Sequence, residues 1–174
     1  KLDILINNAG TGIYKPFADV TDEELQYAMA MNFFSQFRIS QRALPLLKKS
    51  LSASIINISG RTAIRGNFPP GSSCSGPAKA AEVRFSIDLA SELAADGIRV
   101  NCIIPGVVKS EERFQLWEKQ AIDPGLNISE VKQIREKFET DSVPSGQKWG
   151  TPEDIANIAL FLGSNKSNYI NGVA

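Results

Sequence analysis

The chain has 174 residues, of which 43% are hydrophobic and 22% charged, and its 19 basic and 19 acidic side chains give a formal net charge of zero. This composition is typical of a single globular domain, residues 1–174, and gives no reason to expect nucleic acid or an anionic membrane as a partner. Histidine is absent, which excludes a histidine-based catalytic triad and a histidine-ligated metal site, so we expect no metal.

Strand and helix patterns alternate along the chain. Short apolar or β-branched runs indicate strands, and apolar residues at helical spacing, such as Ala81, Phe85, Leu89 and Leu93, indicate helices. A capping box at Thr21–Glu24 and an N-cap at Thr151 mark two helix starts. The predicted elements are, in chain order, a strand at 2–6, a helix from 21 to about 48, a strand at 54–58, a helix at 78–93, a strand at 98–104 and a helix from 151 to about 162. A charged insert, 110–140, precedes the last helix.

Both ends of the sequence fall inside predicted structure. The first strand starts almost at once, and a further apolar run begins after the turn signal Asn171-Gly172. We therefore expect an incomplete domain, a fragment of a longer fold. The two cysteines, Cys74 and Cys102, lack a CxxC spacing and fit unpaired thiols in a reducing compartment, and no apolar run approaches the ~18 residues that span a bilayer. We expect a cytoplasmic protein.

Strands separated by helices predict right-handed βαβ units, and hence a doubly wound α/β fold with a parallel sheet covered on both faces. In such folds ligands bind beyond the carboxyl ends of the strands. Three predicted loops follow strands and should meet at that edge: 7–12, 60–77 and 105–110.

Several motifs agree in order and spacing with one family. They are Leu5–Gly10, Asn57–Gly60, Lys79 opening a small-residue helix, Arg99–Asn101 leading into Pro105–Ser110, and Gly150–Ala156. On these motifs the chain resembles the short-chain dehydrogenase/reductase family. The resemblance implies a Rossmann-like fold from which the first βαβαβ half, about 80 residues, and most of the last strand are missing.

The resemblance also implies roles for individual residues. Asn32 would hold a water in a proton relay, and Lys79 would bind the ribose hydroxyls of a nicotinamide cofactor, NAD or NADP. The cofactor-binding set that it implies is Asn8, Ala9, Gly10, Lys79, Pro105, Gly106, Val107 and Ser110. The family's glycine-rich phosphate loop has no counterpart, because Gly10-Thr11-Gly12 does not open a helix.

Two positions depart from the family pattern. Ser75 stands four residues before Lys79, where the family has the tyrosine that serves as general acid or base. An aliphatic hydroxyl is far less acidic than a phenol, so Ser75 is a poor candidate for the acid/base position, although the only one. Aligning Gly66-Asn67 with the same dipeptide of the family puts Gly60 where the family has its catalytic serine.

Two functions follow as hypotheses. One is hydride transfer between NAD or NADP and a small carbonyl or alcohol substrate; the other is a non-catalytic binding or scaffold protein derived from such an enzyme. The family resemblance implies a homodimer or homotetramer paired through the helices at 21–48 and 78–93. Lys79 could instead be a solvated first-turn lysine, and the Asn8 amide could tie two strands together. Phe114 and Trp117 of the insert could cover apolar surface.

Overall fold

A computed structural model describes residues 1–66, 71–111, 115, 127, 129, 130, 132, 133, 136, 137 and 149–174. The chain divides into two compact units, residues 1–105 with 157–174 and residues 106–156. The elements, in chain order, are β1 (Ile4–Asn7), η1 (Phe17–Asp19), α1 (Asp22–Met29), the π-helical η2 (Ala30–Phe34), α2 (Ser35–Leu47), β2 (Ser54–Ile58), η3 (Arg61–Ala63), α3 (Ser75–Leu93), η4 (Ala94–Asp96), β3 (Arg99–Ile103), α6 (Pro152–Gly163) and η5 (Asn165–Ser167).

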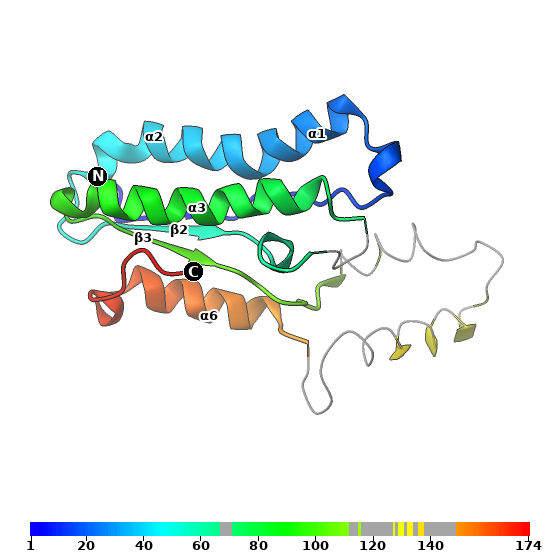
Figure 1. The fold of residues 1–174 in the computed structure, drawn as a ribbon. Helices are drawn as coiled ribbons and strands as arrows, with labels where there is room; N and C mark the ends of the chain where they lie inside the picture. The colour runs from blue at the N-terminus through cyan, green and yellow to red at the C-terminus, as the bar shows by residue number, and fades with distance from the viewer. Residues whose placement is uncertain are drawn as a thin grey trace. The chain divides into compact units, whose positions relative to one another are not determined.

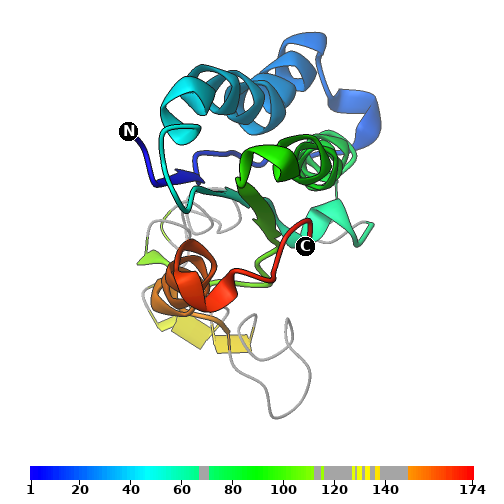
Figure 2. The same cartoon turned by 90° about the vertical axis from the view of Figure 1, so that its left-hand side faces the viewer.

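The first unit is built on a parallel sheet in the order β1-β2-β3. All five residues of β2 are buried, which identifies it as the central strand. Helices α2 and α3 lie along one face of the sheet, and residues 157–163 of α6 lie on the other (Figures 1 and 2). The predicted doubly wound parallel arrangement is confirmed, and the carboxyl ends of the three strands share one edge.

The helix predicted from residue 21 to about 48 forms as α1, η2 and α2 in succession. Its start is the capping box read from the sequence: the Thr21 side chain accepts the Glu24 N–H, and the Glu24 carboxylate accepts the Thr21 N–H. The π-helical turn at 30–34 was not predicted. Such turns interrupt α-helices frequently at functional sites, and this one contains Asn32.

Helix α3 differs from its prediction in start and in face. It begins at Ser75 rather than at residue 78, and the apolar residues Ala81, Phe85 and Leu89, which recur at helical spacing, are only half-buried. The buried stripe is Ala78, Glu82, Ser86, Ala90 and Leu93. Mostly small and polar side chains thus face the sheet, while Phe85 packs against Phe33 and Phe37 of the neighbouring helix segment.

The chain leaves α3 through η4 and Gly97, whose φ of +70° is the left-handed conformation that glycine adopts without strain. The apolar run predicted after Asn171-Gly172 lies beside β3, because the Gly172 N–H donates to the Val100 carbonyl at 2.8 Å and the Cys102 N–H donates to the Val173 carbonyl at 2.9 Å. Among the described residues, no helix is long and apolar enough to cross a bilayer.

The second unit, residues 106–156, joins the segment after β3 to the start of α6. A β-bridge pairs Val108 with Gly150, and the Lys109 N–H donates to the Gly150 carbonyl at 2.7 Å. Thr151 caps α6 as predicted: its hydroxyl accepts the Asp154 N–H, and the Asp154 carboxylate accepts the Thr151 N–H. Phe114 and Trp117, assigned to an apolar-covering role, lie outside the described residues.

Candidate functional site

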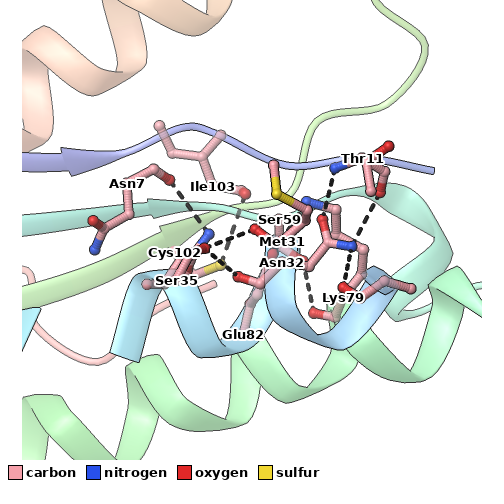
Figure 3. Close-up of polar contacts among 12 residues, drawn as sticks. Asn7, Thr11, Met31, Asn32, Ser35, Ser59, Lys79, Glu82, Cys102 and Ile103 are labelled. Atoms are coloured by element: carbon pink, nitrogen blue, oxygen red, sulfur yellow. Dashed lines mark hydrogen bonds and ion pairs between the residues drawn. The ribbon is translucent and has the colours of Figure 1, made fainter. Parts of the chain in front are cut away.

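Three of the residues singled out in the sequence meet beyond the carboxyl end of β1. A Cβ atom at Gly10 would lie 2.7 Å from Lys79 Nζ and 2.8 Å from Asn32 Oδ1, so only a glycine leaves room for both groups. Lys79 comes from the first turns of α3 and Asn32 from the π-helical turn (Figure 3). Residues 10, 32 and 79, far apart in sequence, therefore form one cluster at the edge where the fold binds ligands.

Asn32 is fully buried, and its side-chain amide hydrogen-bonds to the segment that follows β1. Its Oδ1 accepts the Thr11 N–H at 3.0 Å, while its Nδ2 donates to the Thr11 carbonyl at 3.1 Å and to the Ala28 carbonyl at 2.8 Å. One side chain thus pairs with both polar groups of one extended residue. Asn32 fixes the path of the chain past the cluster.

Ser75 repeats this arrangement one step further along the same segment. Its hydroxyl accepts the Ile13 N–H at 2.6 Å and donates to the Ile13 carbonyl at 2.9 Å, and the residue is fully buried. The Lys15 N–H donates to the Gly71 carbonyl at 3.1 Å just beyond. The single proton of the Ser75 hydroxyl is therefore held by the backbone of the post-β1 segment, which we define as residues 11–15.

At the exit of β2, Ser59 and Gly60 point in different directions, as neighbours at a strand end do. Ser59 is buried, and its hydroxyl donates to the Lys79 carbonyl at 2.7 Å. A Cβ at Gly60 would instead meet the Lys79 Cδ at 3.9 Å, which is ordinary contact. Gly60, which has no side chain, therefore faces the aliphatic stem of Lys79, whereas the Ser59 hydroxyl is directed to the Lys79 backbone.

Sequence reasoning missed Glu82, the residue that contacts the Lys79 ammonium. Its Oε1 and Oε2 lie 3.1 Å and 3.4 Å from Lys79 Nζ, and its side chain is fully buried. Burial raises the pKa of Glu82 to about 7, against the opposing effects of Lys79 and Ser59. The available signal was the spacing from Ala78 to Glu82, which puts both residues on one face of α3.

The remaining predicted residues lie as follows. Asn8 and Ala9 are exposed directly after β1. The strand-tying amide is that of Asn7 rather than Asn8, since Asn7 Nδ2 donates to Asn57 Oδ1 at 2.7 Å across the β1–β2 pair. The Pro105 carbonyl accepts the Arg61 N–H at 3.1 Å and so prolongs the β2–β3 pairing. Gly106, Val107 and Ser110 belong to the second unit, where the Val107 carbonyl accepts the Gly150 N–H.

An open groove of ≈ 720 Å³ lies beside the N-terminus of α3. Its lining is mainly apolar, with Phe17 83% and Ile64 70% exposed. The lining residues come from η1, the segment after β2 and the start of α3: Pro16, Phe17, Thr62–Gly66, Gly71–Ser73, Gly76, Pro77 and Ala80. A groove of this size and character fits a small, largely apolar ligand.

Comparison with known proteins decides the family. The family model described as "Enoyl-(Acyl carrier protein) reductase" matches residues 1–174. The chain belongs to the short-chain dehydrogenase/reductase family. A tropinone reductase homologue of Arabidopsis thaliana is 35% identical over 172 residues, which are 99% of this chain and 58% of that protein. A 3-oxoacyl-(acyl-carrier-protein) reductase of Chlamydia muridarum is 32% identical over 171 residues, which are 98% of this chain and 62% of that protein.

A solved member of the short-chain dehydrogenase/reductase family has the same fold. L-sorbose reductase of Gluconobacter frateurii, in complex with NADPH and L-sorbose, is 28% identical and matches with a TM-score of 0.87 over 99% of this chain and 63% of the other. The chain thus spans about three fifths of the length of the relatives that it matches. Relatives in this family are nicotinamide-dependent oxidoreductases, and the question for this chain is what its own residues at the site can do.

Proposed function

We propose that the protein is an oxidoreductase of the short-chain dehydrogenase/reductase type, which transfers a hydride between NAD or NADP and a small carbonyl or alcohol substrate. The observation that carries this proposal is the cluster of Lys79, Asn32 and Gly10 at the carboxyl edge of the sheet. Lys79 offers its ammonium at that edge, and Asn32 fixes the chain beside it. Both are the residues that the family resemblance assigns to the site.

The residues present fit one side of a nicotinamide dinucleotide. Asn8, Ala9 and Gly10 are exposed, and the missing Cβ of Gly10 leaves space beside the Lys79 ammonium, which would bind ribose hydroxyls. Pro105 follows β3, and Gly106, Val107 and Ser110 follow it in the chain as candidates for the nicotinamide side. When bound, the cofactor would supply or accept the hydride; the protein's residues would bind and orient it.

The substrate would occupy the groove beside the start of α3. The groove borders the α3 turn that carries Ser75 and Lys79, since Gly76, Pro77 and Ala80 line it. Its apolar lining, with Phe17 and Ile64 exposed, favours a substrate that is mainly hydrocarbon around its carbonyl or alcohol group. Reaction of an alcohol or carbonyl also needs a proton acceptor or donor at the oxygen.

A second candidate function is a non-catalytic binding protein of the same family. The hydrogen bonds of Ser75 to Ile13 favour it, because they use the hydroxyl that stands in the family's acid/base position. Gly60 contributes no hydroxyl either. In this alternative the protein would bind a nicotinamide dinucleotide and a small ligand without turnover.

The test combines binding and turnover on the protein as its source makes it. Titration with NADH and NADPH, followed by nicotinamide fluorescence, should show binding that weakens in Lys79→Met. Carbonyl reduction by the wild type would support the oxidoreductase. Reduction that appears only in the double variant Gly60→Ser/Ser75→Tyr would support the non-catalytic alternative, and no dinucleotide binding at all would contradict both.

We further propose that the protein acts in the cytoplasm and self-associates as a homodimer or homotetramer through the outer surfaces of α2 and α3. Support for self-association comes from exposed aromatic side chains on these helices. Phe34 and Phe37 are 38% and 42% exposed, and they pack with the half-buried Phe33 and Phe85.

A further inference from the structure

A fully buried carboxyl group lies one helical turn after Lys79. Glu82 faces the sheet from α3, and both its oxygens lie within 3.4 Å of Lys79 Nζ (Figure 3). The Lys79 side chain is itself only 13% exposed. In the ion pair Lys48–Asp96, by comparison, the side chains are 47% and 33% exposed. The Lys79–Glu82 pair therefore stands apart by its burial.

The surroundings of the Glu82 carboxyl identify its single charged partner. From α3 it meets Lys79, from the exit of β2 the Ser59 hydroxyl, and from β3 the Cys102 thiol. The pKa of that thiol is raised to about 11, mainly by burial, so Cys102 stays uncharged at neutral pH. Within the described residues, the Lys79 ammonium is the one charge that stabilises a Glu82 carboxylate.

The Lys79 ammonium, which contacts Glu82, also lies next to residues of the candidate site. Lys79 Nζ and Asn32 Oδ1 lie 2.7 Å and 2.8 Å from the position that a Cβ of Gly10 would take, and the lysine stem passes Gly60. Neither Gly60 nor Ser75 brings a polar side chain to the ammonium. Because both side chains are largely buried, removing one partner would leave the other charge buried without compensation.

We propose that Glu82 is the positioning residue of the site: its carboxylate holds the Lys79 ammonium against Gly10 and Asn32, at the edge where a ligand would meet it. In the family, the polar neighbour of this lysine is the tyrosine phenol. In this chain, the polar neighbour of Lys79 is the Glu82 carboxylate. The proposal concerns the chain's own side chains, so it stands or fails independently of whether the protein reduces a carbonyl.

The experiment measures how firmly Lys79 is held. Glu82→Gln keeps the shape of the side chain and removes its charge. The variant should let the ammonium leave its buried place and raise the rate of amine-specific labelling at Lys79, followed by peptide mass spectrometry, about tenfold, which is the change expected from losing one charged hydrogen bond. Asp96→Asn is the matched control, and labelling of its partner Lys48 should change less than twofold, as expected for an exposed pair.

An unchanged labelling rate of Lys79 in a folded Glu82→Gln variant would overturn the proposal, because the lysine would then be held by packing alone. A second measurement uses only the wild type and so survives a variant that fails to fold. The carboxyl carbon resonance of Glu82 and the Nζ resonance of Lys79 should shift together, with one midpoint near neutral pH. A Lys79 resonance that does not follow the titration of Glu82 would also overturn the proposal.

Discussion

The Ser75 hydroxyl hydrogen-bonds to both polar groups of the Ile13 backbone. The Ile13 nitrogen lies 2.6 Å from Ser75 Oγ, and Ser75 Oγ lies 2.9 Å from the Ile13 carbonyl oxygen. The Asn32 amide hydrogen-bonds to both backbone groups of Thr11, two residues before Ile13, in the same way. Alternate residues of an extended segment present their backbone groups to the same side. The side chains of Asn32 and Ser75 can therefore both bind residues 11–13, which connects this segment to η2 and α3. The residue in the acid/base position thus has a structural task.

Ser75→Ala should therefore destabilise the protein. It leaves the partly buried N–H and carbonyl of Ile13 without partners, which should lower the free energy of unfolding by about 1–3 kcal/mol. Urea unfolding followed by far-UV circular dichroism measures the change. Ser73→Ala, at an exposed position two residues earlier, is the control and should cost less than about 0.5 kcal/mol. Equal effects of the two substitutions would show that the Ile13 contact contributes nothing particular.

Gly10→Ala tests the crowding at the cluster. The new methyl group would stand 2.7 Å from Lys79 Nζ and 2.8 Å from Asn32 Oδ1, and the Asn32 amide is fixed by three hydrogen bonds. Pushing these groups apart should lower the free energy of unfolding by about 1–3 kcal/mol. Gly66→Ala is the matched control, since nothing lies within 4 Å of its Cβ position. A Gly10→Ala variant as stable as Gly66→Ala would mean that the cluster can open without cost.

Local signals in the sequence were enough to predict the helices, the strands and the parallel sheet. The Thr21–Glu24 capping box, the β-branched run at 54–58 and the alternation of strands and helices gave the elements and the parallel sheet, because each depends on neighbours in the chain. The site depends on distant partners. Ser75 and Ile13 are 62 positions apart, so no local pattern reveals that the hydroxyl is occupied.

Glu82 could not be predicted as buried for a different reason. A charged residue is ordinarily placed on the solvent side of a helix, so its residue type gives no sign that Glu82 lies on the buried face of α3. Burial of Glu82 becomes understandable only once Lys79 is seen to point inward with it. The π-helical turn around Asn32 likewise has no signature in residue types alone.

The stability of the protein should fall as the pH rises from about 5 to 7. Burial raises the pKa of Glu82 to about 7 in the folded protein, above the ordinary value of 4.5, so the folded state binds the proton more tightly than the unfolded one. The stabilisation is complete below the ordinary pKa and is lost as pH rises through 7, with a slope of at most about 1.4 kcal/mol per pH unit.

Among the described residues, Glu82 is the one group whose shifted pKa falls in this window. The chain has no histidine, and Asp3, Glu24 and Asp154, whose pKa values are lowered, act with the opposite sign only where the pH falls below the ordinary carboxyl range. Urea unfolding at several pH values measures the slope in the wild type and in Glu82→Gln, which should be nearly flat. The same slope in both proteins would place its origin elsewhere.

An aromatic surface on η2, α2 and α3 should mediate self-association. It consists of Phe33, Phe34, Phe37 and Phe85, whose ring centroids lie 5.3–6.1 Å apart in the pairs that touch, with the Arg38 guanidinium 5.5 Å above the Phe34 ring. Exposed aromatic groups that already pack together are the residues that dominate protein interfaces. A hollow of ≈ 300 Å³ among them could receive a side chain of a second copy.

Phe37→Glu should shift the assembly toward monomer, because a carboxylate at the centre of an apolar interface must be desolvated when the copies meet. Light scattering after size-exclusion chromatography, over a range of micromolar concentrations, measures the mass. Leu51→Glu serves as the control, since Leu51 is fully exposed in the turn between α2 and β2 and its loss tests general stickiness. A wild type that is monomeric throughout, or a Phe37→Glu variant with the wild-type mass, would exclude this surface as the interface.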